Sequence, residues 1–171
     1  MYELKLDGYR ALAIKTGQRV QLRSRNNNDF TGKYPAIVKA LERLPDESVI
    51  DGELVAFDKS GRPSFNTLQN GETSGVPISY FLFDVLVLAG RNLLGESLNV
   101  RRALLRTKLL PKVKDPVREA PELKGTLRDI VAAVRSHRFE GVVAKRLDSL
   151  YETGRRSGAW QRCASTKDRN S

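Results

Sequence analysis

Residues 5–10 read KLDGYR and lie within a segment, residues 2–14, in which apolar and polar side chains alternate. This alternation is typical of a strand with one buried face, and it predicts a single strand over residues 2–14. In such a strand Lys5 and Asp7 share a face, because successive side chains point to opposite sides. Gly8 then breaks the run. Whether this charged face is merely solvated or forms a functional site depends on the rest of the sequence.

The net charge of the chain is strongly positive and unevenly distributed. The 171 residues include 30 Lys and Arg against 20 Asp and Glu, a net charge of +10. Residues 1–98 contain as many acidic as basic side chains, so the whole excess lies in residues 99–171. Such an excess favours a polyanionic partner, nucleic acid before a membrane surface, and a solubilising surface is the alternative explanation.

Cysteine and histidine are too rare for several kinds of site. Cys163 is the single cysteine, which excludes an internal disulfide and a cysteine-based zinc cluster, and the single histidine, His137, disfavours a histidine triad. No apolar run approaches the roughly 20 residues of a membrane span, and no signal-peptide pattern opens the chain. We therefore expect a single-domain cytoplasmic protein, with no membrane partner, whose chemistry depends on Lys, Arg, Asp and Glu.

Strands and helices are predicted to mix without a strict strand–helix–strand rhythm, which favours an α+β fold with a largely antiparallel sheet. The most apolar strand, ISYFLFDVLVL at residues 78–88, is too aromatic and β-branched for a helix of that length. The other predicted strands cover residues 19–25, 48–57 and 139–146. Helices are predicted over residues 34–44, 64–70, 99–110 and 125–137, and the tail from Asp148 onward is interpreted as polar and basic.

Acidic residues beside glycines recur within otherwise apolar strands, as Asp7-Gly8, Asp51-Gly52-Glu53 and Glu140-Gly141. Glycine weakens a strand interior unless a ligand or another backbone must approach closely. A carboxylate on an inner strand is costly unless it is paired or coordinates a metal ion. A lone Asp-Gly is more often a turn, but three such pairs indicate a cleft where lysine, carboxylates and a phosphate ligand meet.

Five short motifs follow one another along the chain: KLDGYR (5–10), RSR (23–25), DGE (51–53), YFLFD (80–84) and EGVVAK (140–145). The series resembles the motifs of the covalent nucleotidyltransferases, and most of all those of the adenylation domain of ATP-dependent DNA ligases. Residues 140–160, EGVVAKRLDSLYETGRRSGAW, are similar in particular to the bacterial ligases that act in double-strand-break end joining. A lone KxDG is weak support, whereas five ordered motifs covering essentially the whole chain are strong support.

The resemblance implies an ATP-grasp-like nucleotidyltransferase fold, with mostly antiparallel sheets flanked by helices, over residues 1–171. It implies ATP and Mg²⁺ as cofactors, a lysyl-AMP intermediate, and nicked or broken duplex DNA as the partner in repair. Family members begin further upstream of the nucleophile and continue into an oligonucleotide-binding domain. We therefore expect an adenylation domain truncated at its N-terminus and lacking that C-terminal domain, and we expect a monomer.

The resemblance also assigns roles to the residues that match the motifs. Lys5 is expected to be the nucleophile that attacks the α-phosphate of ATP. Glu3 matches the position that contacts the adenine amino group, and Phe83 matches the aromatic that stacks on adenine. Glu140 and Glu53 match the metal-side carboxylates, Glu53 also lying near the ribose. The other expected nucleotide contacts are Leu6, Arg10, Arg25, Lys145 and Arg162.

The chemistry constrains the protonation of Lys5. A lysine with its usual pKa near 10.4 is protonated and cannot attack phosphorus. Burial, Mg²⁺ and neighbouring arginines would lower the pKa of Lys5, whereas Asp7 alone would raise it. We therefore expect the metal and phosphate electrostatics to dominate. Taken singly, these residues have simpler interpretations: a solvated strand face for Lys5 and Asp7, a capped turn for Asp51, and plain core for Phe83.

One motif departs from the family pattern. Family members have Trp-x-Lys-x-Lys, whose lysines grip the α-phosphate, where this chain has WQRCA at residues 160–164. Arg162 keeps one positive charge in a different geometry, Ala164 keeps none, and Lys167 is displaced by three residues. We therefore expect Lys5 adenylation to be slow.

Two other interpretations remain open. An RNA ligase or an mRNA-capping guanylyltransferase shares the KxDG motif, although Glu3 and the stretch Arg155-Arg156-Ser157 favour the DNA ligase. A catalytically impaired domain that binds nucleotide or nucleic acid is the alternative from another class, motivated by Ala164 and the missing oligonucleotide-binding domain. Covalent labelling with AMP separates these interpretations.

Overall fold

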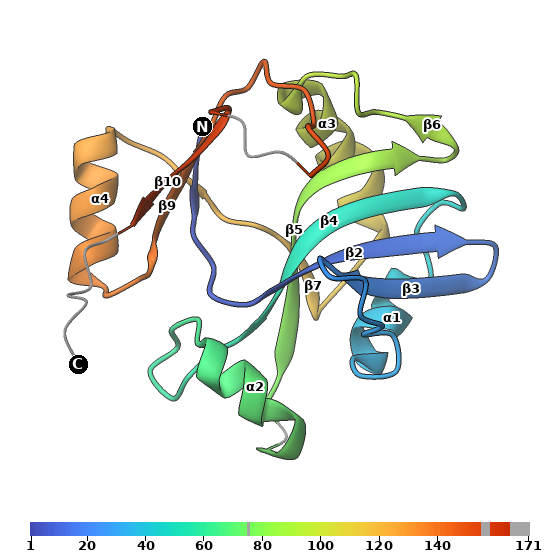
Figure 1. The fold of residues 1–171 in the computed structure, drawn as a ribbon, viewed down its shortest axis with the longest axis horizontal. Coiled ribbons are helices and arrows are strands. Elements are labelled where there is room, and N and C mark those ends of the chain that lie inside the picture. Colours follow the sequence, from blue (N-terminus) through green and yellow to red (C-terminus); the bar gives the residue numbers. More distant parts are fainter. Residues whose placement is uncertain (75, 155–157, 165–171) are drawn as a thin grey trace.

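Two β-sheets and four α-helices form the computed structural model, which describes residues 1–74, 76–154 and 158–164. The larger sheet has the strand order β3-β2-β4-β5-β6, with β7 also paired to β5, and the smaller sheet has the order β10-β9-β1-β8 (Figure 1). The larger sheet contains β2 (Tyr9–Thr16), β3 (Arg19–Ser24), β4 (Ser48–Ala56), β5 (Ile78–Leu88), β6 (Arg91–Asn92) and β7 (Val117–Glu119). The smaller sheet contains β1 (Tyr2–Leu4), β8 (Glu122–Leu123), β9 (Gly141–Lys145) and β10 (Trp160–Ala164).

All strand pairings among the described residues are antiparallel except that between β5 and β7. The predicted α+β fold with mostly antiparallel sheets is therefore confirmed. The strand predicted over residues 78–88 is β5, and it is buried along most of its length because β4 flanks it on one side and β6 and β7 on the other. Its Tyr80 is fully buried, and the hydroxyl donates to the Ala11 carbonyl at 2.7 Å.

Helices flank both sheets. α1 (Pro35–Leu41) packs on β3 through Ile37 and Leu41, and α3 (Leu98–Leu104) packs on β5. α2 (Phe65–Ser74) lies beside β4, and α4 (Leu127–Ser136) lies beside β9 at the other side of the molecule (Figure 1). None of the helices in the described part of the chain is long and apolar enough to cross a membrane.

The ends of two helices follow from their sequences. α4 begins after Thr126, whose hydroxyl accepts a hydrogen bond from the Asp129 N–H at 3.2 Å, as an N-cap residue does. The helix predicted over residues 99–110 is shorter than expected: α3 passes into a π-helical segment, η1 (Leu105–Leu109), and a 3-10 turn, η2 (Leu110–Lys112). Pro111 lacks an N–H and cannot continue an α-helix.

The single strand predicted over residues 2–14 is wrong. The segment forms two strands in different sheets, β1 and β2, and residues 5–8 cross between them (Figure 1). Lys5 and Asp7 therefore do not share a strand face. A methyl group at Gly8 would collide with the carbonyl oxygen of Leu54, so only glycine allows the crossing chain to approach β4 this closely. The periodicity was correct for each part, but it could not reveal the change of sheet.

The tail also differs from its interpretation as polar chain. Residues 160–164 form β10, which pairs with β9 along its whole length, from Trp160 opposite Lys145 to Ala164 opposite Gly141. The alternation in WQRCA is that of a strand: Trp160 and Arg162 line a cavity, whereas Cys163 packs beside Ile130 and Val142. This segment has only five residues, two of which are polar, Gln161 and Arg162, so its alternation was too weak to predict a strand.

Candidate active site

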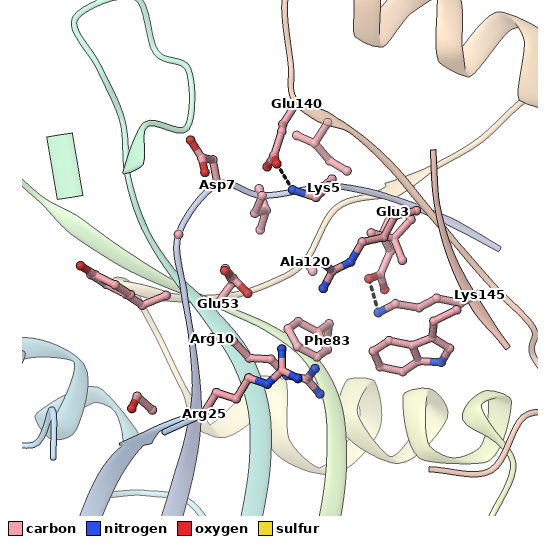
Figure 2. Close-up of a pocket in the computed structure, with 18 of the residues that line it drawn as sticks. Glu3, Lys5, Asp7, Arg10, Arg25, Glu53, Phe83, Ala120, Glu140 and Lys145 are labelled. Atoms are coloured by element: carbon pink, nitrogen blue, oxygen red, sulfur yellow. Dashed lines mark hydrogen bonds and ion pairs between the residues drawn. The ribbon is translucent and has the colours of Figure 1, made fainter. Parts of the chain in front are cut away.

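The crossing segment opens onto a cavity of about 410 Å³ between the two sheets. Figure 2 shows side chains from both sheets pointing into it. Every residue predicted from the sequence to touch nucleotide or metal lines this one cavity, although the residues come from widely separated parts of the chain. They are Glu3, Lys5, Leu6, Arg10, Arg25, Glu53, Phe83, Glu140, Lys145 and Arg162. Their convergence is an observation, and their individual roles remain predictions.

Lys5 lies on the crossing segment, held by a hydrogen bond from its N–H to the Gly141 carbonyl at 2.9 Å. Its side chain is 21% exposed, and its ammonium forms an ion pair with Glu140, the residue just before β9 (Figure 2). Burial lowers the pKa of Lys5, Arg162 lowers it further, and Asp7 and Glu53 act in the opposite direction. The ion pair with Glu140 also favours the ammonium form of Lys5.

Glu53 and Arg10 face the cavity from neighbouring strands, where they are paired across β2 and β4. Burial raises the pKa of Glu53 to about 7, against the opposing effect of Arg10. Arg10 itself is held by Asp51, with Nε donating to Oδ1 at 3.0 Å and Nη2 donating to Oδ2 at 2.5 Å. The Tyr151 hydroxyl donates to Oδ2 of Asp51 at 2.9 Å. The buried carboxylate of Asp51 therefore holds the Arg10 guanidinium in place.

Gly52, which lies between Asp51 and Glu53, occupies a position where a side chain would not fit. A methyl group there would lie 2.6 Å from Cε2 of Tyr80 and 2.7 Å from the Phe81 carbonyl oxygen. The pairing of β4 and β5 shifts register between Asp51 and Gly52, as at a β-bulge. The prediction that another group approaches a strand glycine closely is therefore confirmed at Gly52, and the approaching group is the neighbouring strand β5.

Phe83 and Trp160 form an aromatic wall, with ring centroids 6.0 Å apart and the rings nearly perpendicular. Cations lie against this wall: the Lys145 ammonium is 4.5 Å from the Phe83 centroid and 4.1 Å from that of Trp160, and the Arg10 guanidinium is 5.5 Å from the Phe83 centroid. Phe83 is only 9% exposed and also packs in a small core cluster with Leu6 and Ala120. It therefore belongs to the core and to the cavity wall at once.

Glu3 is 3% exposed, an unusual place for a carboxylate, and two cations compensate it. Lys145 donates to one oxygen, Oε2, and Nη1 of Arg102 lies 2.9 Å from the other, Oε1. Sequence reasoning missed Arg102. A signal was present, because Arg102 lies on the apolar face of its helix between Leu98 and Leu105, where a charged side chain must be paired.

Among the residues that the structure describes, no group of three or more His, Cys, Asp or Glu side chains could hold a metal ion alone. Mg²⁺ in nucleotide sites is held by one or two carboxylates together with phosphate oxygens and water. Glu140 and Glu53 line the same cavity, one on each side of Lys5 in Figure 2. This donor set fits Mg²⁺ bound together with a polyphosphate, and it does not fit a metal site made by protein alone.

Two mostly antiparallel sheets around a lysine-containing cavity define a nucleotidyltransferase fold. The solved structure described as mycobacterial DNA ligase D complexed with ATP and MES has this fold, with a TM-score of 0.83 and 40% sequence identity. The superposition covers 94% of this chain and 52% of that chain. An archaeal ATP-dependent RNA ligase, at a TM-score of 0.56 and 16% identity, shares the fold alone.

Residues 1–163 match the family described as ATP dependent DNA ligase domain, and the chain belongs to that family. The multifunctional non-homologous end joining protein LigD of Pseudomonas aeruginosa is 42% identical over 162 residues, 93% of this chain and 19% of that protein. The corresponding DNA repair protein LigD of Mycobacterium tuberculosis is 42% identical over 160 residues, 93% of this chain and 21% of that protein. The chain thus spans about a fifth of the length of these relatives.

Proposed function

We propose that residues 1–171 act as the adenylation domain of an ATP-dependent DNA ligase that works in the repair of nicked or broken DNA. The observation that carries the proposal is the convergence of Lys5 and the nine other predicted residues on one cavity. The family match and the likeness to a ligase D bound to ATP support the same conclusion. Sealing of duplex DNA would be completed by an oligonucleotide-binding domain that clamps the substrate.

In the proposed reaction the Lys5 amine attacks the α-phosphorus of ATP, a nitrogen–phosphorus bond forms, and pyrophosphate leaves. The neutral amine is required, and burial and Arg162 favour it by lowering the pKa of Lys5. Bound Mg²⁺ would supply charge neutralisation on the phosphates, held by Glu140 and Glu53. Phe83 would stack on the adenine, Glu3 would accept from its amino group, and Arg10, Arg25, Lys145 and Arg162 would hold the ribose and phosphates.

The test is the intact mass of the protein before and after incubation with ATP and Mg²⁺. We expect an added mass equal to AMP in the wild type and none in Lys5→Ala, because Lys5 is the only lysine in a KxDG context. Circular dichroism of Lys5→Ala should match the wild type. An AMP-sized adduct that persists in Lys5→Ala would disprove the assignment. Comparing ATP with GTP as the donor separates a ligase from a capping guanylyltransferase.

A second candidate function rests on residue 164. Where family members place the second lysine of their last motif, β10 carries Ala164. We infer that loss of this charge slows adenylation, and in the extreme the domain would bind nucleotide or nucleic acid without forming the covalent adduct. Retained ATP binding with no AMP-sized adduct in the wild type would favour this impaired binding domain.

A further inference from the structure

Arg102 connects the two sheets immediately behind the cavity. It lies on α3, is 2% exposed, and does not line the cavity itself. Its Nη1 lies 2.9 Å from Glu3 on the smaller sheet and donates to the Phe83 carbonyl oxygen on the larger sheet at 3.2 Å. Its Nη2 donates to Glu119 at 2.7 Å. A single guanidinium therefore sets where the carboxylate of Glu3 lies relative to the aromatic ring of Phe83.

The two cations on Glu3 are not equivalent. Lys145 lines the cavity and holds Oε2, whereas Arg102 holds Oε1 from the protein side. The Lys145 ammonium also lies over the rings of Phe83 and Trp160. A base that stacks on Phe83 and hydrogen-bonds to Glu3 would need the space that this ammonium occupies (Figure 2). Binding of the base therefore requires Lys145 to leave Glu3.

A buried carboxylate that loses its only cation is strongly destabilised. Arg102 prevents this outcome, because it remains on Oε1 when Oε2 is vacated. Its planar guanidinium forms two hydrogen bonds, to the Phe83 carbonyl oxygen and to Glu119, and an ion pair with Oε1 of Glu3. Oε2 of Glu3 can then accept a hydrogen bond from a ligand.

We propose that Arg102 is a positioning residue for base recognition: it is the counter-ion that holds the carboxylate of Glu3 in place while Lys145 exchanges from Glu3 to the nucleotide. The ligand that this arrangement selects is a purine with an amino group on the six-membered ring opposite Glu3. The inference rests on the proposed function, in which adenine lies against Phe83. It adds a residue on α3, outside the cavity, to the determinants of base specificity.

ATP and ITP provide the appropriate pair of probes. They have nearly the same shape, but the adenine amino group donates to a carboxylate, whereas the hypoxanthine carbonyl oxygen would be repelled by it. A hydrogen bond to a charged group contributes enough to separate the two by roughly tenfold or more. Binding can be followed by the fluorescence of Trp160, which is the single tryptophan of the chain and lines the cavity.

Arg102→Gln should weaken ATP binding roughly tenfold or more and change ITP binding much less, so that the ATP preference falls. Arg102→Lys should show a smaller fall, because one ammonium cannot reach Glu3, the Phe83 carbonyl and Glu119 together. The matched control is Arg101→Gln. Arg101 is the neighbouring residue on α3 and is fully buried, but its carboxylate partner is Asp84. This variant should lose stability and keep the ATP preference.

The proposal is overturned by a folded Arg102→Gln with the wild-type ratio of ATP to ITP affinity, or by an equal fall in that ratio in Arg101→Gln. If Arg102→Gln does not fold, a wild-type ratio in Arg102→Lys overturns it. An equal affinity of the wild type for ATP and ITP does the same. Because fluorescence reports binding rather than chemistry, a wild type that binds ATP but forms no AMP adduct contradicts only the proposed reaction.

Discussion

The carboxylates around Lys5 favour its charged form, whereas the proposed reaction needs its neutral form. The reaction needs a neutral amine, and burial and Arg162 lower the pKa of Lys5, but Glu140 contacts the ammonium directly. Glu53, on the other side, has a pKa raised to about 7 by burial. The contacts and the protonation of both carboxylates should therefore change when a cation or a polyphosphate enters the cavity.

Glu140→Ala is expected to reduce the rate of adenylation and to change its dependence on Mg²⁺ more than Glu53→Ala does. The reason is that Glu140 lies against Lys5 at the cavity wall and is 39% exposed, open to a cation, whereas Glu53 is largely buried. Removing a residue that only supports a metal ligand typically lowers activity by roughly 10–100-fold. We expect the rate of adenylation to fall at least as much when the ligand itself is removed. Rates of AMP transfer are measured over a Mg²⁺ titration, and superimposable normalised curves for Glu140→Ala and wild type would exclude the metal role.

Glu53→Gln is expected to change how stability depends on pH in the absence of ligands. Between pH 4.5, the ordinary pKa of the side chain, and about pH 7, the unfolded chain has released a proton that the native protein retains. The stability of the wild type therefore falls as the pH rises through this window, by an amount on the order of 3 kcal/mol. Glu53→Gln should lack this loss.

Urea denaturation at several pH values between 4 and 8 measures the effect. The same substitution at the exposed Glu42 is the control, and it should leave the wild-type dependence unchanged. Parallel pH profiles for Glu53→Gln and the wild type would show that Glu53 is ionised at the same pH in the native and unfolded states.

At the scale of secondary-structure elements, α3 is attached to β5 by a pair of fully buried charges. Nε of Arg101 donates to Oδ1 of Asp84 at 2.7 Å and Nη2 donates to Oδ2 at 2.9 Å, and both side chains are 0% exposed. Nη1 of Arg101 also donates to the carbonyl oxygens of Glu96 and Ser149. The pair therefore links β5, α3 and the segment that follows β9.

Arg101→Ala is expected to destabilise the protein by roughly 3–5 kcal/mol, because it leaves the Asp84 carboxylate buried without its cation. The double variant Asp84→Leu with Arg101→Met should be clearly more stable than Arg101→Ala, since neither position then carries a buried charge. The free energies of unfolding of the wild type and of both variants, measured in urea, test this prediction. A loss below about 1 kcal/mol in Arg101→Ala, the range of surface ion pairs, would mean that the pair is effectively solvated.

At the scale of the whole molecule, the basic excess of residues 99–171 is only partly available to a partner. Arg101, Arg102 and Lys145 are buried and paired with carboxylates, and Arg106 bridges Glu119 and Glu122 at 2.6 Å. These four cations are already engaged with carboxylates of the domain itself. The number of phosphates that the domain neutralises should therefore be well below its count of basic residues.

We expect binding to nicked duplex DNA that weakens steeply with salt, is nearly independent of sequence, and has a dissociation constant on the order of micromolar or weaker. Anisotropy at several salt concentrations gives the slope. Charge reversal at Arg155 and Arg156, which lie outside the described residues, should lower both the affinity and the slope, whereas reversal of the exposed Arg43 should change neither. A flat salt dependence would indicate a solubilising surface.

The sequence by itself determined the elements with strong periodicity, and it predicted ten residues that line one cavity. The strand at 78–88 and the helices near 34–44, 64–70 and 125–137 were all predicted, because side-chain period acts locally. The site residues followed from motif order, and all ten line one cavity. Their types and spacing are set by the ligand, and this leaves a mark on the sequence.

Only the tertiary structure decided which sheet each half of residues 2–14 joins, and that Lys5 lies in the crossing between them. It also decided that β10 completes the smaller sheet and that Arg102 supports Glu3. Several of these features depend on partners more than 95 residues away, such as Gly141 for Lys5 and Lys145 for Glu3. Local periodicity carries no information about such distant contacts, and the buried Glu3 gains its two cations only when β9 and α3 pack beside β1.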